Sequence, residues 1–457
     1  MTNCYEVQFF VFAYVLEVNG EAKLAALPEE SSGWYNKERF VSKEFMVVSA
    51  HPLATKAGYD IINMGGNAID AMIAVQLVLN LVEPQSSGIG GGAFLLYYDS
   101  YSQRLTSYDG RETAPRRATE TLFYNKTTSQ PKSFTEALVG GSSVGVPGIL
   151  DRLPQDKRIE NELPNNVSFG AFNDFQPSEY QPTPRAMHLF AEACKLAFAD
   201  RNRYLAEMDL NWDLLLDSDY LTTRASLIKD ISMGQAPAGS FSRDQLLVNK
   251  SESGDQPPHE FPCTSHISIV DRDGNAISLT TSIEHEFGSS IMVEGFLLNN
   301  QLTDFNFIYY DDNTQCSFAN KVRPNKRPRS SMSPTLIFKK YNDNNNRSQL
   351  VMSIGAAGGP LIPMVLGKSI IATLNWGISL QDSFNMVNFG SDNRFGLSAV
   401  EIGHLNQTFL TQLEQQFGQK IFQFGSPTGM QGFTYDTKSK TYIGASDPRK
   451  EGSAMGD

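Results

Sequence analysis

Cysteine and histidine are scarce in this sequence. Of its 457 residues, six are histidines and four are cysteines, which stand at positions 4, 194, 263 and 316. The cysteines are dispersed and form no Cys-x-x-Cys pair, which argues against a disulfide scaffold and a zinc ribbon. The sequence also lacks the His-Glu-x-x-His pattern of zinc hydrolases. We therefore expect neither a metal nor a cofactor.

Long apolar runs and an excess of basic charge are lacking as well. No apolar run approaches the roughly 20 residues that a membrane-spanning helix needs. The short apolar stretch 9–16 has no Lys or Arg before it, which makes a poor signal peptide. With 38 basic and 50 acidic residues, the net charge of −12 argues against binding to nucleic acid, because such binding relies on Lys and Arg neutralising phosphates. The cellular compartment is left open.

Composition divides the chain into segments. Residues 1–45 have little periodicity and are interpreted as a leader or mobile N-terminus, whereas dense apolar patterning begins at Met46. Residues 151–184 are rich in Pro, Asn and acidic residues, which is typical of a linker, and a helix is predicted at about 185–205. Residues 222–262 are again polar, with Gly, Ser and Pro.

The stretch 263–282 predicts a β-hairpin. Apolar and polar residues alternate on both sides of the Asp-Gly pair at 273–274. Asp-Gly between two such runs is a strong hairpin signal, because both residues tolerate a positive φ. If these two residues form the whole loop, Ser282 faces Ser265. The hairpin therefore brings Ser282 beside Thr264, at the end away from the turn.

Thr264 could act as a nucleophile if the bond between Cys263 and Thr264 were cut. The freed α-amine has a reference pKa of roughly 7.7–8.0, which suits a general base at neutral pH. It would activate the hydroxyl of the same residue, as in an N-terminal-nucleophile hydrolase. Most threonines at the start of a strand are ordinary polar residues, so the flanking motifs must decide.

Three glycine-containing motifs suggest different chemistries. The glycines at 90–92 lie between a predicted helix and a predicted strand, which reverses the order found in a dinucleotide site. The Gly-x-Ser-x-Gly match at 141–145 is followed by Val-Pro-Gly, which cannot form the helix that a serine-hydrolase elbow needs. Residues 355–360 follow a predicted strand at 349–354 and precede a helix. That order is typical of an anion nest made of free backbone N–H groups.

Further motifs follow one another in order along the chain. They are SAHPLA at 49–54, GGNAIDA at 65–71, GIGGG at 88–92, DGRETAP at 109–115, GVPG at 145–148, NNQ at 299–301, PNKRP at 324–328, SSMSP at 330–334, GG at 358–359 and GASDP at 444–448. With these motifs and the hairpin at Thr264, the sequence resembles the γ-glutamyltranspeptidase (glutathione hydrolase) family, including its acylase-like branch. The resemblance covers about 46–148 and 183–448.

This resemblance implies an α/β fold, the αββα sandwich of N-terminal-nucleophile hydrolases, made as a proenzyme that cuts itself before Thr264. Residues 46–263 would form the large-subunit region and residues 264–457 the small catalytic subunit, held together as a heterodimer. Thr264 would attack a small γ-glutamyl substrate such as glutathione and form an acyl-enzyme. Water would then hydrolyse the acyl-enzyme, or an amino acid or peptide would accept the acyl group.

The resemblance also implies catalytic partners for the threonine. Backbone N–H groups at Gly358 and Gly359 would form an oxyanion hole, worth about 3–4 kcal/mol of barrier per donor. Ser282, which stands where the family usually has threonine, would orient the amine of Thr264.

Substrate-binding residues are implied in the same way. Arg111 would hold the substrate α-carboxylate, since a planar guanidinium matches its two oxygens. Ser330 and Ser331 would donate hydrogen bonds to the same group. Gln301 and Asp304 would hold the α-ammonium group.

Two departures from the family pattern stand out. Glu284 occupies a position where typical transpeptidases carry asparagine at the ammonium site, whereas the acylase-like branch has this glutamate. Between Gly148 and about Val167, the family normally has on the order of a hundred more residues of the large-subunit region, so either this part is rebuilt smaller or the sequence is an incomplete isoform or gene model. Two other functions therefore stay open: an amidase or acylase of related side chains, and a non-catalytic homologue that fails to mature.

Overall fold

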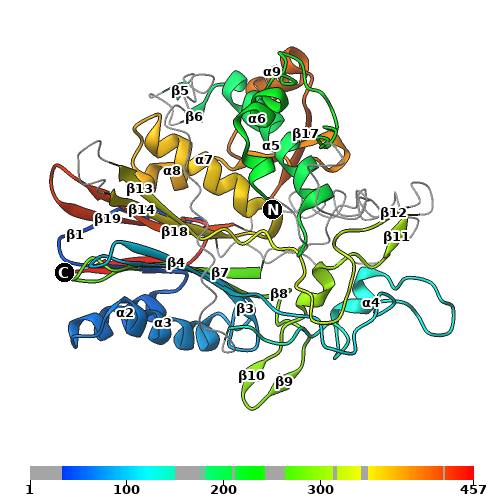
Figure 1. Ribbon diagram of the computed structural model, residues 1–457. Coiled ribbons are helices and arrows are strands. Elements are labelled where there is room, and N and C mark those ends of the chain that lie inside the picture. The colour runs from blue at the N-terminus through cyan, green and yellow to red at the C-terminus, as the bar shows by residue number, and fades with distance from the viewer. Residues whose placement is uncertain are drawn as a thin grey trace.

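Two antiparallel β-sheets stacked face to face form the centre of the molecule (Figure 1). The computed structural model describes residues 33–149, 175–176, 181–207, 212–241, 263–311, 316–340, 348–425 and 428–457. The five-stranded sheet has the order β1 (Phe40–Ser42), β19 (Thr441–Ser446), β18 (Gly429–Asp436), β14 (Ser348–Ala357), β13 (Thr335–Lys340). The six-stranded sheet has the order β20 (Ser453–Gly456), β2 (Met46–Ser49), β7 (Cys263–Val270), β8 (Ala276–Glu284), β3 (Gly92–Asp99), β4 (Arg104–Gly110).

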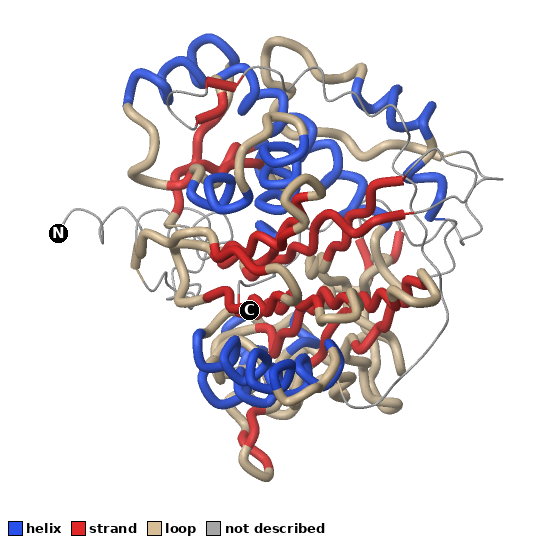
Figure 2. Tube along the Cα trace, turned by 90° about the vertical axis from the view of Figure 1, so that its left-hand side faces the viewer, coloured by secondary structure: helices blue, strands red, loops and turns tan. Residues whose placement is uncertain are grey.

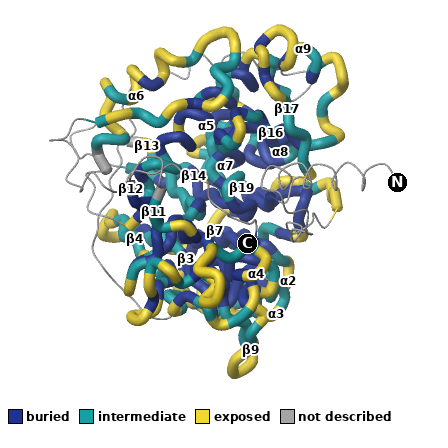
Figure 3. Tube along the Cα trace, turned by 90° about the vertical axis from the view of Figure 1, so that its right-hand side faces the viewer, coloured by how far each residue is buried: buried dark blue, intermediate teal, exposed yellow. Residues whose placement is uncertain are grey.

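Helices cover the outer face of each sheet. α2 (Pro52–Asn63) and α3 (Ala68–Val82) lie under the six-stranded sheet, and α7 (Ile362–Leu374) and α8 (Leu380–Asn385) lie over the five-stranded sheet (Figure 1). Figure 3 shows the two sheets as a deeply buried layer between partly exposed helices. This is the αββα sandwich that the sequence predicts, and the prediction is confirmed.

Local capping explains where α3 begins. The Asn67 side chain accepts hydrogen bonds from the N–H groups of Ile69 and Asp70, and the Asp70 carboxylate accepts one from the Asn67 N–H, which makes a capping box. The Ala68 N–H donates to Asp271 Oδ2 at 2.9 Å. The start of this helix is therefore fixed both by its own sequence and by the loop between β7 and β8.

Both faces of β7 are buried, so the alternation in its sequence separates two interior surfaces. Ile267 and Ile269 pack into the apolar cluster formed with α2 and α3. His266 and Ser268 point to the other sheet, where Ser353 Oγ on β14 donates to Ser268 Oγ at 2.8 Å. Strands buried on both faces are usually apolar throughout. Here the surface between the sheets is polar towards the Thr264 end.

The register of the β7–β8 hairpin differs from the prediction. Val270 pairs with Ala276, so the loop spans 271–275 and not only the Asp-Gly pair. The Asp271 carboxylate accepts hydrogen bonds from the N–H groups of residues 273 and 275, and this local network stabilises the longer loop. Ser265 consequently faces Thr281, and the predicted pairing of Ser265 with Ser282 is wrong.

A β-bulge then changes the register at the beginning of β7. The shift falls between Cys263 and Ser265, at Thr264, and beyond it Cys263 pairs with Glu284. Between these two pairs β7 has only Thr264 whereas β8 has Ser282 and Ile283, so the extra residue of the bulge is on β8. Ser282 therefore lies beside the 263–264 peptide bond after all, although it is not opposite Ser265.

A third group of elements lies outside α7 and α8 (Figures 1 and 2). It consists of α5 (Pro184–Tyr204), α6 (Ser218–Ala225), β15 (Phe389–Gly390), β16 (Leu397–Glu401), α9 (Gln407–Phe417) and β17 (Lys420–Phe424). Met187 and Phe190 of α5 pack with Leu413 of α9 and Ile371 of α7. α5 corresponds to the helix predicted at about 185–205.

The remaining regular elements are short. They are α4 (Phe134–Leu138), β5 (Phe175–Gln176), β6 (Gln181–Pro182), η2 (Trp212–Leu216), β9 (Met292–Val293), β10 (Phe296–Leu297), η3 (Gln301–Asp304), β11 (Tyr310–Asp311), β12 (Cys316–Ser317), η4 (Gly359–Leu361) and η5 (Arg394–Gly396). Most of the predicted linker at 151–184 lies outside the described residues. Phe40–Ser42, at the end of the predicted leader, form β1, and the assignment of segments stays a prediction.

Candidate active site

The peptide bond before Thr264 lies within β7 with its carbonyl oxygen hydrogen-bonded. Ser282 Oγ donates to the Cys263 carbonyl oxygen at 2.7 Å and accepts from the N–H of Glu284 at 2.9 Å. Thr264 itself is only 6% exposed, at the bulge described above. In the continuous chain the Ser282 hydroxyl thus holds the carbonyl of the predicted cleavage bond, and not an amine of Thr264.

Glu284 is the next residue in this series of hydrogen bonds, and its backbone conformation is unusual. Its φ is +81°, a region that costs a non-glycine residue about 1–3 kcal/mol and is held only by surrounding contacts. One such contact is the bond from its N–H to Ser282 Oγ. On the other side, Gln301 Nε2 donates to Glu284 Oε2 at 3.0 Å. The strained residue therefore connects Ser282 to the predicted ammonium-binding residues.

Gln301, Asp304 and Arg111 complete one continuous polar network. Gln301 and Asp304 begin and end the single turn of η3, where side chains three residues apart lie on one side. Gln301 Nε2 donates to Asp304 Oδ2 at 2.7 Å, and Arg111 Nη2 donates to the same oxygen at 2.5 Å. All three are at most 3% exposed. The structure thus brings together five of the predicted residues, from Arg111 to Ser282.

Arg111 is already engaged on several sides. Its Nη2 also donates to the Arg329 carbonyl at 2.6 Å, and its Nε donates to the Pro328 carbonyl at 3.3 Å. Burial alone lowers the pKa of this guanidinium, but the carboxylates of Asp304, Glu112 and Glu284 raise it above its ordinary value. Arg111 is therefore charged and paired with Asp304, and its binding of a substrate carboxylate stays a prediction.

Glu112 is a site residue to which sequence reasoning assigned no role, although it lies in the DGRETAP motif. It is fully buried, and Arg111 Nη1 stands 3.7 Å from its Oε2. Burial raises its pKa to about 8, against the opposing effect of Arg111. Glu112 is thus largely protonated at neutral pH. The network thus places three carboxyl groups, those of Glu112, Glu284 and Asp304, near the Arg111 guanidinium.

Ser330 and Ser331 are close in sequence to this network but make other contacts. They follow the two carbonyls that bind Arg111. Ser331 Oγ accepts from Arg201 Nη2 of α5 at 2.6 Å, and Ser330 Oγ accepts from the N–H of Met332 at 3.1 Å. Binding of a carboxylate by these serines stays a prediction.

The predicted oxyanion glycines lie at the end of β14. Ser353 Oγ donates to Ser268 Oγ at 2.8 Å, and a Cβ built on Gly355 would lie 2.1 Å from Cε1 of His266. Each two-residue step along β14 therefore matches a two-residue step back along β7. Gly358 and Gly359 follow directly after β14, and their place beside Thr264 stays a prediction.

Gly358 and Gly359 adopt conformations that favour glycine. Their φ values are +135° and +54°, and α7 begins at Ile362 just beyond them. The predicted order of strand, glycines and helix is therefore found in the structure. The start of a helix with free N–H groups suits a developing negative charge.

His266 lies two residues from Thr264 and is an apparent candidate for a general base. Its Nδ1 contacts Thr280 Oγ1 at 2.9 Å and its Nε2 contacts Ser268 Oγ at 3.0 Å. Burial lowers its pKa to about 3. Because hydroxyls occupy both ring nitrogens and the ring is neutral, His266 serves the packing of the two sheets.

The family model described as gamma-glutamyltranspeptidase matches residues 54–155 and 167–457, which is most of the chain. The chain belongs to the gamma-glutamyltranspeptidase family. It is 27% identical to the glutathione hydrolase proenzyme of Bacillus subtilis (strain 168), over 94% of each chain, and 26% identical to that of Escherichia coli (strain K12), over 89% of this chain and 91% of the relative. This gamma-glutamyltranspeptidase homologue also shares its fold with a cephalosporin acylase from Bacillus halodurans, with a TM-score of 0.67, 19% identity, and coverage of 95% and 99%.

Relative to these transpeptidases, the chain is shortened internally. Its alignment with the Bacillus subtilis relative extends over 578 positions, 121 more than the 457 residues of this chain, so gaps open within it. The family model is interrupted between residues 155 and 167, in the stretch where the sequence predicts the shortening.

The described residues offer no grouping of three or more His, Cys, Asp or Glu side chains that could hold a metal ion. In the same part of the chain, none of the helices has the length and apolarity needed to cross a membrane.

Proposed function

We propose that this protein is a self-processing γ-glutamyl hydrolase and transferase that acts on glutathione and other γ-glutamyl amides through Thr264. One observation carries the proposal: the Ser282 hydroxyl lies on the Cys263 carbonyl, and this pair is linked through Glu284 to a buried cluster of acidic and basic residues. Membership of a family of hydrolases and transferases supports the reaction class.

Self-cleavage begins with the Thr264 hydroxyl adding to the Cys263 carbonyl carbon. The oxygen that becomes negative is the one that accepts the Ser282 hydrogen bond, so this hydroxyl stabilises the intermediate. The C–N bond then breaks as the nitrogen takes the proton from the attacking hydroxyl, which leaves an ester between the two residues. Water hydrolyses the ester, giving a Cys263 carboxylate and a Thr264 with a free amine and a free hydroxyl.

Substrate turnover uses the newly formed amine as a general base. It takes the proton of the Thr264 hydroxyl as the oxygen attacks the γ-glutamyl carbonyl. Departure of Cys263, which is 1% exposed in the uncut chain, leaves Ser282 free to orient that amine. Backbone N–H groups at Gly358 and Gly359 hold the oxyanion. Water or an amino-acid or peptide acceptor then releases the acyl group.

Substrate recognition involves an exchange of ion pairs. The α-carboxylate of a γ-glutamyl group replaces Asp304 as the partner of Arg111, and Ser330 and Ser331 are further donors to it. The α-ammonium group then binds the Asp304 carboxylate that this exchange releases. Glu284, a second carboxylate in the same network as Asp304, would also favour this cationic group. Gln301, which donates to both Asp304 and Glu284, keeps the two carboxylates together during the exchange.

Denaturing electrophoresis with N-terminal sequencing tests the proposal. The expected result is two chains, the second beginning at Thr264, and release of the anilide from a γ-glutamyl anilide. Thr264→Ala should remain uncut and inactive, while Thr55→Val, which alters a buried threonine of α2, should be cut. A single uncut band near 50.6 kDa would contradict the proposal and favour a non-catalytic homologue.

An amidase or acylase is the second candidate, because Glu284 is the residue of the acylase-like branch of the family at a position where typical transpeptidases carry asparagine. The fold shared with a cephalosporin acylase is compatible with this candidate. A glutaryl-type amide lacks the α-ammonium group that Asp304 and Glu284 would bind. Faster turnover of a glutaryl-type amide than of a γ-glutamyl anilide would support the acylase.

A further inference from the structure

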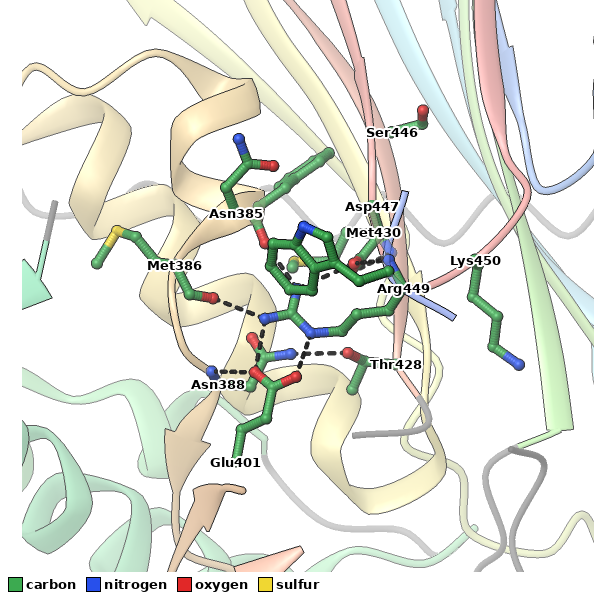
Figure 4. A network of polar contacts seen from close by, with 12 residues as sticks. Asn385, Met386, Asn388, Glu401, Thr428, Met430, Ser446, Asp447, Arg449 and Lys450 are labelled. Carbon is green, nitrogen blue, oxygen red and sulfur yellow. Dashed lines mark hydrogen bonds and ion pairs between the residues drawn. The ribbon is translucent and has the colours of Figure 1, made fainter. Parts of the chain in front are cut away.

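A second buried polar network lies just after β19 of the five-stranded sheet and includes Asp447 of the GASDP motif (Figure 4). Its centre is Arg449, which donates to both carboxylate oxygens of Glu401 at 2.6 Å and to Asp447 Oδ1 at 3.0 Å. Arg449 also donates to the backbone carbonyls of Phe384 and Met386 at 2.7 and 2.9 Å. Bidentate pairs of this kind fix geometry strongly, because two parallel bonds prevent rotation.

Asn388 connects this network to its neighbours. Its backbone N–H donates to Glu401 Oε2 at 2.9 Å, and its backbone carbonyl accepts from the Glu401 N–H at 2.8 Å. Its side-chain oxygen accepts from Lys368 Nζ of α7 at 2.7 Å. The remaining amide group, Nδ2, donates to Thr428 Oγ1 at 2.8 Å (Figure 4). Asn388 is fully buried and is held at both its backbone and its side chain.

Thr428 connects the network around Arg449 and Asn388 to Gly358. Ala357 pairs with Gly429 in the β14–β18 ladder, so Thr428 is the next residue opposite Gly358. A Cβ built on Gly358 would lie 2.9 Å from Thr428 Cγ2, so the two residues are in direct contact. The chain beyond Thr428 is held as well, since the Asp447 N–H donates to the Met430 carbonyl at 2.8 Å and the Met430 N–H donates to Asp447 Oδ2 at 3.2 Å.

We propose that Thr428 and Asn388, fixed by the Glu401–Arg449 pair, are positioning residues that set the orientation of the Gly358–Gly359 turn for the developing oxyanion. This inference rests on the proposed function, in which these glycines donate to the acyl intermediate. An oxyanion hole works because its donors are oriented before the reaction, and a small displacement from productive geometry lowers the rate. Gly358, with a φ of +135°, has no side chain of its own to fix its orientation.

Thr428→Val tests the inference, since valine keeps the methyl group that faces Gly358 but loses the hydroxyl that accepts from Asn388. The expected result is a kcat for a γ-glutamyl anilide about tenfold to a hundredfold below wild type, with KM within twofold. Self-cleavage should proceed at the wild-type rate, because Ser282 and not the glycine turn supports that step. Thr428→Ser, which keeps the hydroxyl, should retain kcat within about threefold of wild type.

Thr55→Val is the matched control. Thr55 is also fully buried, and its hydroxyl contacts Ser49 Oγ at 2.8 Å in the opposite layer of the sandwich. It should lower the thermal unfolding temperature as Thr428→Val does, yet leave kcat unchanged. Asn388→Ala removes the donor of the same Asn388–Thr428 hydrogen bond. It replaces Thr428→Val in the test if the valine variant does not fold.

The outcomes separate the two proposals. If wild-type protein is cut and active while Thr428→Val, or Asn388→Ala in its place, keeps kcat within threefold of wild type, the positioning role is wrong and the proposed function stands. If kcat falls but self-cleavage falls equally, the effect is a general loss of structure and the positioning role is also wrong. If wild-type protein is neither cut nor active, the proposed function fails, and this inference fails with it.

Discussion

Replacing Ser282 by alanine should separate the chemistry of self-cleavage from the stability of the fold. Ser282 Oγ is the donor to the Cys263 carbonyl at 2.7 Å and the acceptor for the N–H of Glu284 at 2.9 Å. Alanine removes both bonds and adds no new group. The first bond bears on the barrier to cleavage, and the second bears on the free energy of unfolding.

The change in the barrier to cleavage and the change in the free energy of unfolding have separate causes. Loss of one donor to a developing oxyanion raises the barrier by about 2.7–4 kcal/mol, which corresponds to cleavage roughly a hundredfold to a thousandfold slower. Loss of the acceptor leaves the Glu284 N–H buried without its partner, which lowers the free energy of unfolding by about 1–3 kcal/mol. Glu284 is 4% exposed, so water replaces that acceptor poorly.

The assay is a time course of cutting in protein synthesised in a cell-free system, followed by denaturing electrophoresis. Ser282→Thr should be cut at a rate near wild type, since threonine keeps the hydroxyl. Ser278→Ala is the matched control on the same strand, because Ser278 is fully buried and its Oγ accepts from the N–H of Thr335 at 3.0 Å. It should lose stability but still be cut normally. Cutting of Ser282→Ala within threefold of the Ser278→Ala rate would refute the reasoning.

Three further predictions concern buried groups around the site, and the two on stability are tested in the uncut Thr264→Ala background. Since the pKa of His266 is about 3 in the folded state, below its unfolded value, stability should fall as pH decreases from about 6.5 to about 3, and His266→Gln should flatten that decrease in urea unfolding. Since the pKa of Glu112 is raised to about 8, stability should fall as pH rises from about 4.5 to about 8; Glu112→Gln should remove that dependence, and an unchanged slope would contradict the burial argument. Gly358→Ala, made in the active protein, would place a Cβ 2.9 Å from Thr428 Cγ2 at a φ of +135°, so kcat should fall at least tenfold while self-cleavage continues; normal kcat would exclude the turn from catalysis.

Much of the fold follows from patterns that are local in sequence. The helix at 68–82 is encoded by its capping box and apolar spacing, and the order of strand, glycines and helix at 348–374 appears as predicted. Such signals are readable because capping and periodicity depend on residues within a few positions of one another. The hairpin register was not readable, because the Asp271 carboxylate stabilises a loop of five residues and β8 has an extra residue opposite Thr264.

For the candidate site, too, the sequence predicted several residues but not the contacts between them. Ordered motifs in the sequence were enough to nominate Arg111, Glu284, Gln301 and Asp304, yet they implied separate contacts with a substrate. In the structure these side chains bind one another, and Arg111 is paired with Asp304 193 positions along the chain. Glu112 gave no signal of its own, because its raised pKa comes from burial that only the folded chain provides.

The sequence by itself determined the family and, through that resemblance, the αββα sandwich, and it nominated the residues that could react. Tertiary structure alone decided which carbonyl Ser282 holds, which carboxylate is neutral, and that Thr428 meets Gly358. The physical reason is that secondary structure is governed by neighbours along the chain, whereas hydrogen-bond partners, burial and pKa are set where two stacked sheets bring distant segments into contact.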